Sequence, residues 1–399
     1  MAKIKKIKGR QVFDSRGNPT IEVEIYSDNN LCASAIVPSG ASTGNHEAYE
    51  LRDKENKDYL GKSVFKAIEN VNGPIAKSLK GIDINDQTKI DKTLIELDGT
   101  EQKKKLGANA ILSVSIAACK LAAIEKNISL FNYLGNSKNF QLPIPLLNII
   151  NGGVHAKNNL DIQEFMIRPD KAKSFSEAMR ISFLVIQNLK SMLDTNNVGD
   201  EGGFSPDLKN NEEAIKLIIK AIEKSGFKAG EDVSICLDVA ANELDKQKTI
   251  DYYSKLIKEY PIKSIEDPFA EDDWDSWSKL AKNTNIQIVG DDLFATNIKR
   301  LEKGIKEKSA NAILVKLNQI GTITETLNVV NLAHKNGFKT IISHRSGDSE
   351  DTFIADLAVA TNSSQIKTGS LARSERVAKY NRLLKIEEEL GNSAKMSKI

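Results

Sequence analysis

The feature that most constrains how this chain can fold is a series of short apolar runs that each end in a polar residue. The runs SICLD, IKSIE, IQIVGD, AILVK, TIISH and SQIK end at Asp238, Glu266, Asp291, Lys316, His344 and Lys367. The intervals between these ends are 28, 25, 25, 28 and 23 residues. A strand, a helix of ordinary length and two short loops fill such an interval, so the series predicts consecutive βα units.

Consecutive βα units build either a closed barrel or an open doubly wound sheet. We favour the barrel because the units follow one another without a glycine-rich nucleotide turn. PIPLLNIIN (143–151) and LDIQEFMIR (160–168) could supply two earlier strands. The carboxyl ends of barrel strands meet at one face, so we expect the polar ends to surround one cavity. For each end taken singly, a solvent-facing position is the alternative.

The chain ahead of the barrel has a different pattern. Three alternating segments in the first 40 residues, separated by glycine, asparagine and proline, predict an antiparallel sheet. Apolar residues three and four apart between residues 61 and 134 predict helices. We therefore expect an α+β domain over residues 1–134 and the barrel over residues 135–399, with a linker at residues 136–145.

Composition narrows the classes of partner. A net charge of +2 over 399 residues argues against a general binder of nucleic acid. The sequence has no run of about 18 uncharged apolar residues and no apolar stretch of the signal-peptide type at its start. We expect a soluble, cytoplasmic protein without a membrane segment. The three scattered cysteines fit neither a disulfide framework nor a zinc site.

Three of the strand ends are carboxylates, namely Asp238, Glu266 and Asp291. Carboxylates crowded at one rim repel each other unless a cation neutralises them, and oxygen ligands suit Mg²⁺ or Mn²⁺. A divalent metal site is therefore the favoured interpretation. Pairing with the abundant lysines is the alternative.

Two further strand ends are lysines, Lys316 and Lys367, with His344 between them. Near a second cation and a metal, the pKa of a lysine falls from its usual value of about 10.4, and a neutral lysine can act as a general base. Arg345 and Ser346 offer a guanidinium fork and a hydroxyl that fit a phosphate. A helix cap with a surface arginine is the alternative for these two.

Other polar stretches are candidates for the same cavity. Glu201 lies among glycines in VGDEGG, where the backbone can come close to a ligand, although a solvated turn would have the same composition. The loop PSGASTG (38–44) is a candidate for a mobile lid, and it lacks the spacing of a P-loop. Near the ends of the two earlier strands lie His155, Gln163 and Glu164.

Ten motifs stand in one order between residues 14 and 370: DSRGNPT, PSGASTG, NIINGG with HA and NN, DIQEFM, VGDEGG, SIEDP, GDDL, KLNQIG, SHRSG and IKTGS. In this order they closely resemble the enolase family, and the resemblance covers nearly the whole chain. It implies an α/β fold in which an N-terminal α+β domain precedes a modified eight-stranded β/α barrel with antiparallel first strands. It also implies a glycolytic enzyme that interconverts 2-phosphoglycerate and phosphoenolpyruvate plus water, as a homodimer or octamer.

The resemblance further implies roles for single residues. Asp238, Glu266 and Asp291 would hold one Mg²⁺, and Ser42 would join a second when substrate is bound. Lys316 would remove the C2 proton, and Glu201, kept protonated by partial burial beside Glu164, would protonate the departing C3 hydroxyl. Substrate contacts would come from His155, Gln163, Glu164, His344, Arg345, Ser346 and Lys367, with the phosphate at Arg345 and Ser346 and the carboxylate at Lys367.

Two other functions are possible for a chain with these motifs, and one segment departs from the pattern of the family. Another acid dehydratase or racemase of the same superfamily is disfavoured by VGDEGG and SHRSG. A binding protein that has kept the fold without catalysis is disfavoured because Lys316, Glu201 and the metal carboxylates are all present. The departure is the segment 239–265, which is shorter than we expect for the family.

Overall fold

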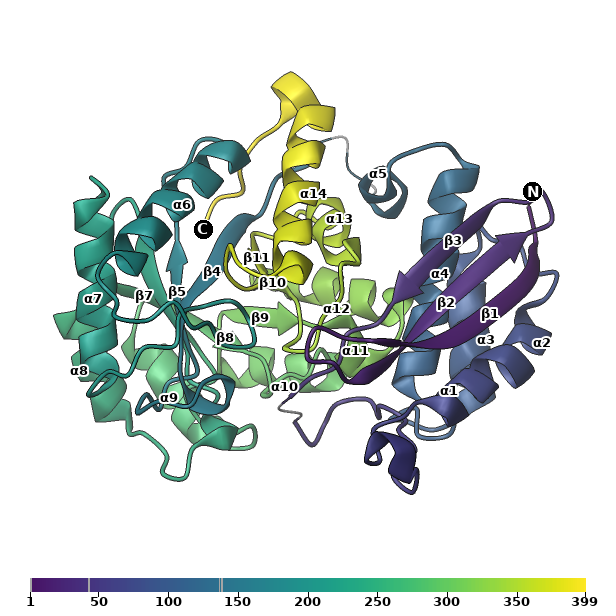
Figure 1. The fold of residues 1–399 in the computed structure, drawn as a ribbon, viewed down its shortest axis with the longest axis horizontal. Coiled ribbons are helices and arrows are strands. Elements are labelled where there is room, and N and C mark those ends of the chain that lie inside the picture. Colours follow the sequence, from purple (N-terminus) through teal and green to yellow (C-terminus); the bar gives the residue numbers. More distant parts are fainter. Residues whose placement is uncertain (1, 42–43, 136, 138) are drawn as a thin grey trace.

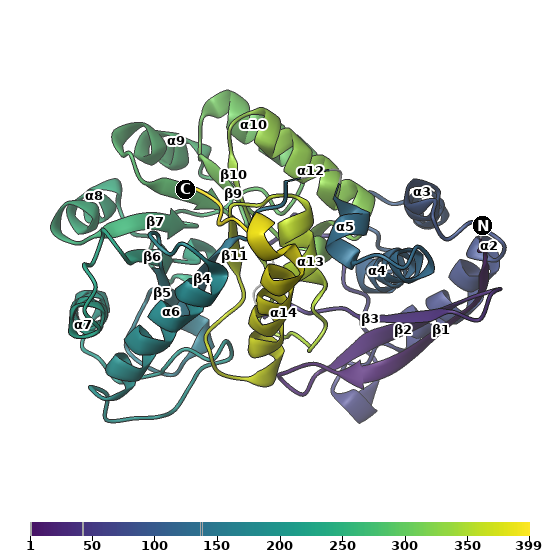
Figure 2. The same ribbon diagram turned by 90° about the horizontal axis from the view of Figure 1, so that it is seen from above.

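The structure, a computed structural model, describes residues 2–41, 44–135, 137 and 139–399. An α+β unit formed by the first part of the chain lies beside a barrel formed by the rest (Figures 1 and 2). Ser42, which we predicted as a metal ligand, lies outside the described residues.

The N-terminal sheet is antiparallel, as predicted. Its strands, in spatial order, are β1 (Ile4–Phe13), β2 (Pro19–Ser27) and β3 (Cys32–Ile36). Alternate residues of a strand face the same side, and on β2 the fully buried Ile21, Val23 and Ile25 form the core face. Helix α4 (Ala108–Glu125) packs against β2 and β3. Although α4 is long and apolar enough to cross a membrane, 83% of it is buried inside the protein, as in the core helix of a domain.

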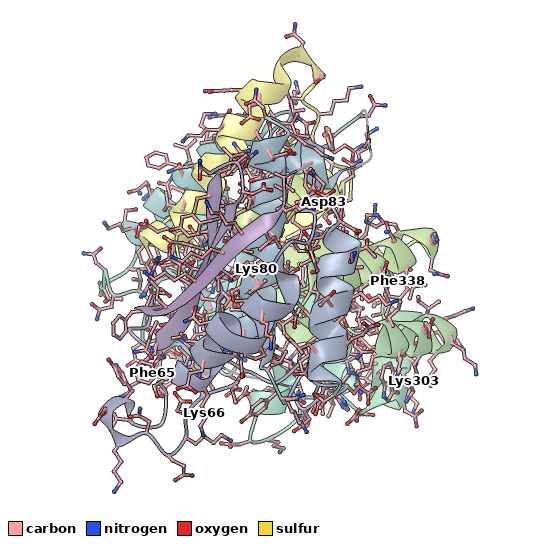
Figure 3. All side chains as sticks on the ribbon, turned by 90° about the vertical axis from the view of Figure 1, so that its right-hand side faces the viewer. Phe65, Lys66, Lys80, Asp83, Lys303 and Phe338 are labelled. Atoms are coloured by element: carbon pink, nitrogen blue, oxygen red, sulfur yellow. The ribbon has the colours of Figure 1, made fainter. Side chains whose placement is uncertain are left out.

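The other helices of this unit follow the period-3.6 pattern between residues 61 and 134. They are α1 (Phe65–Asn70), α2 (Ala76–Leu79), α3 (Gln87–Asp98) and α5 (Leu130–Leu134), with short turns η1 (Lys57–Tyr59) and η2 (Val71–Ile75). η2 is a π-helical turn that contains Pro74, which has no N–H to continue the regular ladder. Figure 3 views this side of the molecule, with Phe65 and Lys66 at the start of α1 and Lys80 and Asp83 just after α2.

Among the described residues, eight strands close into a barrel, which confirms the predicted fold class. The strands are β4 (Ile144–Asn151), β5 (Glu164–Arg168), β6 (Ser234–Asp238), β7 (Ile262–Glu266), β8 (Gln287–Gly290), β9 (Ala312–Val315), β10 (Lys339–Ser343) and β11 (Gln365–Lys367). β5 runs antiparallel to both β4 and β6, and the other neighbouring strands are parallel. This is the modified strand order that the resemblance implied.

Helices cover the outside of the barrel. They are α6 (Phe175–Lys190), α7 (Asn211–Lys224), α8 (Ile250–Glu259), α9 (Trp274–Asn283), α10 (Ile298–Glu307), α12 (Ile323–Lys335), α13 (Phe353–Ala360) and α14 (Ser374–Leu390). The short helix α11 (Leu317–Ile320) and the turns η3 (Gly153–His155) and η4 (Ala241–Glu243) follow β9, β4 and β6, and η5 (Gly391–Ser393) follows α14. Helix α12 illustrates why these segments are helical. Thr322 caps its first turn by accepting the N–H of Glu325, and Val329, Val330 and Ala333 form a buried apolar stripe along the helix.

The inside of the barrel has three layers. At the amino ends of the parallel strands, Arg168 donates to Gln365 (3.1 Å), Gln365 donates to Gln287 (2.7 Å), and Gln287 donates to Ser264 (2.9 Å). The middle layer is an apolar cluster made by Leu146, Met166, Cys236, Val289, Ala312, Leu314 and Ile341. The third layer holds the polar strand ends at the opposite mouth, so the apolar layer separates two polar ones.

Candidate active site at the mouth of the barrel

The six polar strand ends come together as predicted. β6, β7 and β11 end on Asp238, Glu266 and Lys367, while Asp291, Lys316 and His344 directly follow β8, β9 and β10. All of these except Glu266 line one pocket, and Glu266 contacts Lys367 beside it. The same pocket is lined by the other described site residues that we predicted: His155, Gln163, Glu164, Glu201, Arg345 and Ser346.

The pocket contains more acidic than basic side chains. Its cations are Lys316, Arg345 and Lys367, whereas its carboxylates are Glu164, Glu201, Asp238, Asp267, Asp291 and Asp292. Uncompensated charge in a buried site is costly, so this excess favours the binding of further positive charge. Burial, and then repulsion by Asp238, raise the pKa of Glu266 well above its ordinary value.

Lys367 lies between carboxylates of β5, β6 and β7. Its Nζ is 2.8 Å from Asp238 Oδ2, 2.8 Å from Glu266 Oε1 and 3.2 Å from Glu164 Oε1. Burial lowers the pKa of this ammonium, but the surrounding carboxylates outweigh burial and raise it well above the ordinary value. Pairing of the acidic strand ends with a lysine is therefore present in the structure. The same all-oxygen donor set also fits a hard divalent cation.

Lys316 contacts Asp291, whose second oxygen accepts a hydrogen bond from Gln319 Nε2 (2.9 Å). Burial lowers the pKa of Lys316, but the contact with Asp291 outweighs burial and raises it. The lowered pKa was expected for a lysine beside a divalent metal and stays a prediction; in this arrangement the carboxylate in direct contact acts more strongly than the neighbouring cations Arg345 and Lys367.

Glu201 lies among polar side chains from three elements. Its carboxylate accepts from Asn148 Nδ2 (3.2 Å) and lies 3.4 Å from His344 Nε2 and 3.9 Å from His155 Nδ1. Burial raises the pKa of Glu201, but these histidines outweigh burial and hold it well below the ordinary value. Burial and the charge of Glu201 raise the pKa of Glu164 instead. In this arrangement the pKa of Glu201 is thus lowered and that of Glu164 is raised, and the role of Glu201 as the acid stays a prediction.

His344 contacts Arg376 with one ring nitrogen and faces Glu201 with the other. Burial lowers its pKa to about 4, although the charge of Glu201 opposes this shift. Its Nδ1 lies 2.5 Å from Arg376 Nη1, and a guanidinium can only donate, so Nδ1 accepts and the imidazole proton is on Nε2, which faces Glu201. Arg376 is completely buried and also donates to the backbone oxygens of Arg345 and Ser346, at 2.6 Å each.

Arg345, one of the two predicted phosphate-binding residues, pairs with a carboxylate of the chain itself. Arg345 Nη1 is 2.8 Å from Glu47 Oε2, and Arg345 Nη2 is 3.1 Å from Glu47 Oε1. Arginine also binds phosphate with such a bidentate contact. Ser346 Oγ accepts the N–H of Ala41 (2.6 Å), so the described end of the predicted lid loop reaches this place.

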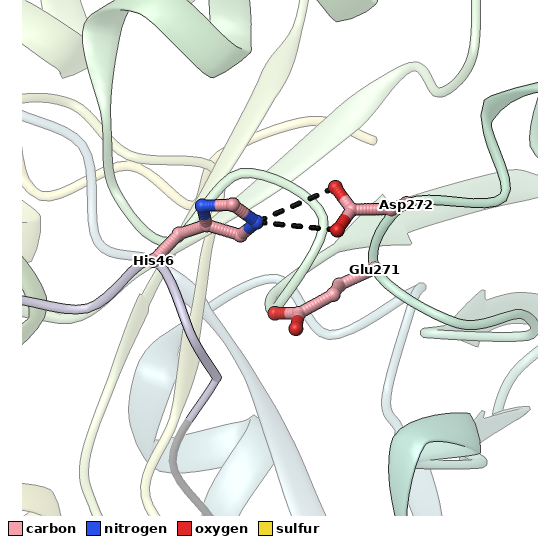
Figure 4. A group of neighbouring side chains, drawn as sticks. All are labelled: His46, Glu271 and Asp272. Atoms are coloured by element: carbon pink, nitrogen blue, oxygen red, sulfur yellow. Dashed lines mark hydrogen bonds and ion pairs between the residues drawn. The ribbon is translucent and has the colours of Figure 1, made fainter.

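Residues after the undescribed pair 42–43 contact the loop that follows β7 (Figure 4). His46 Nε2 lies 3.3 Å from Asp272 Oδ1, and Asn45 N donates to Glu271 Oε2 (3.2 Å). Sequence reasoning gave no role to His46, because nothing in the sequence indicates that these distant segments meet.

The glycines of VGDEGG allow this loop to pack closely against other segments of the chain. A Cβ on Gly199 would lie 2.8 Å from Asn151 Oδ1, and a Cβ on Gly202, which has φ +82°, would lie 2.7 Å from the oxygen of Ala372. These glycines approach β4 and the segment after β11, and the approach to a ligand stays a prediction. Their packing places Glu201 over the mouth of the barrel.

Several polar residues at the site escaped the sequence analysis. Nothing in the local sequence indicates that Glu47 belongs to the site, and Arg376 stands out only because arginine is rare in this chain. Gln319 lies in the motif KLNQIG, but the sequence analysis gave it no role. The other missed residues are Asn148, Asp267 and Asp292, which join the site through hydrogen bonds or the pocket lining.

Comparisons with known proteins match both parts of the chain. Residues 4–134 match the family model "Enolase, N-terminal domain", and residues 139–250 and 242–398 match "Enolase, C-terminal TIM barrel domain". "Enolase" of Pelagibacter ubique (strain HTCC1062) is 64% identical over 418 aligned positions that cover 100% of both chains. Because the alignment is longer than the 399 residues of this chain, the relative has residues that this chain lacks. The barrel match divides at residues 242–250, within the segment that we expected to be short.

Proposed function

Because this chain belongs to the enolase family and is therefore a lyase of the phosphopyruvate hydratase class, we propose that its barrel mouth dehydrates 2-phosphoglycerate with Lys316 as base and Glu201 as acid. The observation that carries these residue roles is the meeting of Lys316, Glu201 and the acidic strand ends in one pocket. The product is phosphoenolpyruvate, and the reaction is reversible.

Lys316 takes the proton from C2 of the substrate. A proton beside a carboxylate is very weakly acidic, because its removal adds negative charge to a group that is already anionic. The contact with Asp291 raises the pKa of Lys316, so Asp291 must be engaged elsewhere before the amine can accept a proton.

Glu201 gives a proton to the C3 hydroxyl. The C3–O bond then breaks, water leaves, and the electron pair from the C2–H bond forms the double bond between C2 and C3. Ligating atoms of Glu164 and Glu201 lie within 4.8 Å of each other, and the charge of Glu201 raises the pKa of Glu164. Repulsion between the two carboxylates therefore favours a proton within this pair.

The acidic strand ends are the residues that would hold a divalent metal. The family implies such a metal, and we propose Mg²⁺, with two ions per site when substrate is bound. Asp238, Glu266 and Asp291 would hold the first ion, and Ser42 would contribute to the second. Bound there, the ions would offset the charge that develops on the substrate carboxylate, as is general for sites of this superfamily.

The cationic residues bind the two anionic ends of the substrate. Arg345 and Ser346 would take the phosphate, for which Arg345 exchanges its contact with Glu47. Lys367 would contact the carboxylate, and His155, Gln163, Glu164 and His344 would line the remaining wall. We further propose a cytoplasmic enzyme that forms homodimers or octamers, with no nucleic-acid partner and no membrane segment.

The direct test is an assay with 2-phosphoglycerate and Mg²⁺ that follows the absorbance of the enol product. We expect turnover that EDTA abolishes and that added Mg²⁺ restores. Absence of an EDTA-sensitive signal from the folded protein would contradict the proposed function.

A further inference from the structure

Gln319 lies in α11, the short helix that starts directly after Lys316. It is only 1% exposed, so both its donor and its acceptor require partners within the protein. Two of these partners lie in the connection between β8 and α10: Asp291 directly after β8, and Thr296 a few residues further on. The amide nitrogen of Gln319 also lies 3.4 Å from Glu47 Oε1.

These partners form a directed chain of hydrogen bonds. Lys316 N donates to Thr296 Oγ1 (2.9 Å), the Thr296 hydroxyl donates to Gln319 Oε1 (2.7 Å), and Gln319 Nε2 donates to Asp291 Oδ1 (2.9 Å). The opposite orientation of the amide would set its oxygen against the Asp291 carboxylate. The direction of every bond is therefore fixed by the chemistry of its partners.

The chain closes into a ring at the proposed base. Asp291 Oδ1 is held by Gln319, while Asp291 Oδ2 contacts the ammonium of Lys316, whose own backbone begins the chain. A neutral amide thus fixes one oxygen of the Asp291 carboxylate, and the other oxygen faces the ammonium of Lys316. A glutamate at position 319 could not donate to Asp291, and a methionine could neither donate nor accept.

The turn that supplies Thr296 has an unfavourable backbone. Ala295 and Thr296 have φ of +45° and +49°, a region that residues with side chains rarely adopt, least of all β-branched ones. Ala295 N donates to Asp291 O (2.7 Å), and Thr296 is completely buried. Such a conformation persists only where surrounding contacts fix it, and here the contacts direct the Thr296 hydroxyl into the ring.

We propose that Gln319 is a positioning residue, which with Thr296 sets the place of the Asp291 carboxylate relative to the Lys316 base. The inference rests on the proposed function and adds to it a residue that does not line the pocket itself. Partners that orient a metal ligand in this way typically change metal affinity or activity by about 10- to 100-fold when they are lost.

The test compares Gln319→Met with Gln287→Met in the full-length, Mg²⁺-loaded protein. Gln287 is a matched control, because it is a buried amide at the other end of the barrel, where it donates to Ser264 (2.9 Å). For Gln319→Met we expect kcat to fall by about 10- to 100-fold and half-saturating Mg²⁺ to rise by about 10-fold, with a much smaller change in KM. Gln287→Met keeps the kcat of the wild type.

Two further measurements separate positioning from packing. The rise in melting temperature caused by a fixed concentration of Mg²⁺, which needs no turnover, is expected to shrink in Gln319→Met and not in Gln287→Met. Thr296→Ser, which keeps the hydroxyl, retains the kcat of the wild type, whereas Thr296→Val behaves like Gln319→Met.

Wild-type kcat and Mg²⁺ dependence in Gln319→Met would overturn the inference, as would equal losses in Thr296→Ser and Thr296→Val. If the wild-type protein does not turn over 2-phosphoglycerate, the proposed function fails. The Mg²⁺-induced melting shift then still decides whether Gln319 positions Asp291.

Discussion

The two ends of the barrel are both polar and buried, but they differ in how their polar groups are partnered. At the amino ends, Arg168, Gln365 and Gln287 form a chain of hydrogen bonds that ends on Ser264. At the carboxyl ends, Glu164 Oε2, Gln163 Oε1 and His155 Nδ1 are buried and have no hydrogen-bond partner within the part of the chain that the structure describes.

This difference distinguishes a polar layer that stabilises the fold from one that binds a ligand. Buried polar groups are normally hydrogen-bonded, so groups without partners indicate where substrate or metal would supply the missing bonds. Loss of a side chain at the amino end is expected to change stability alone. Loss of one at the carboxyl end is expected to change activity far more than stability.

Lys316→Ala is expected to give the largest effect. Removal of the proposed base should lower kcat by about 10⁴-fold, equivalent to about 5.5 kcal/mol in the activation free energy. Steady-state kinetics with 2-phosphoglycerate measure this loss, and circular dichroism checks the fold. Lys335→Ala, an exposed residue at the end of α12, is the matched control and should retain wild-type kcat. Substantial remaining turnover in Lys316→Ala would refute the assignment of the base.

Glu201→Gln is expected to lower turnover by about 10³-fold, because the C3 hydroxyl then leaves without a proton from a neighbouring acid. Lys316 is intact in this variant, so exchange of the C2 hydrogen of 2-phosphoglycerate with deuterium from solvent should continue. Nuclear magnetic resonance follows the exchange. Loss of exchange in proportion to turnover would show that Glu201 acts on the first step as well, against the proposed division of roles.

Arg168→Met tests the other end of the barrel. Arg168 is 2% exposed and its Nε donates to Asp170 (2.6 Å), so removing it takes one donor away from the Asp170 carboxylate and one from the Gln365 amide oxygen. We expect the free energy of unfolding to fall by about 3 kcal/mol while kcat is unchanged. Urea unfolding and kinetics measure the two quantities, with the exposed Arg180→Met as control. A large loss of kcat in the folded variant would contradict the proposed difference between the two ends of the barrel.

Asp91 extends the comparison to a buried cluster outside the barrel. Its carboxylate accepts from Thr324 N (2.9 Å) and Ser115 Oγ (2.6 Å), and it joins α3 to the start of α12. All of these groups have partners, so Asp91→Asn should leave kcat unchanged and lower the free energy of unfolding by about 1 kcal/mol at pH 5.

The pH dependence of Asp91 has a definite sign. Burial raises the pKa of this carboxyl above its ordinary value, although hydrogen bonds from Ser115 and Thr324 oppose the rise. Folded protein therefore keeps a proton that unfolded chain has lost, and this contribution to stability falls as pH rises above about 4. Urea unfolding at a series of pH values should show the fall in the wild type and a flatter dependence in Asp91→Asn. Identical slopes would contradict a raised pKa.

The fold and part of the candidate site could be predicted because both depend on local patterns. The regular spacing of apolar runs gave the barrel, and the six polar ends of those runs meet at one mouth. The antiparallel β5 and the roles of single residues did not follow from spacing. They were expected through the resemblance to the enolase family, which the comparisons later established for the chain as a whole.

The proton positions at the site could not be predicted in this way. The pKa of Lys316 depends on its contact with Asp291, and the pKa of Glu201 depends on histidines that approach it from other elements. Arg345 and Glu47 are 298 residues apart in the chain, yet their side chains are in direct contact.

The sequence by itself determined the barrel, the mouth at which its polar ends meet, and the family to which the resemblance pointed. Only the tertiary structure decided which carboxylate neighbours which lysine, where Glu47 binds, and how Gln319 connects Asp291 to Lys316. The physical reason is that strand period and helix period are properties of neighbouring residues. Coulombic and hydrogen-bond energies instead depend on distances of a few ångströms between residues that only the folded chain brings together.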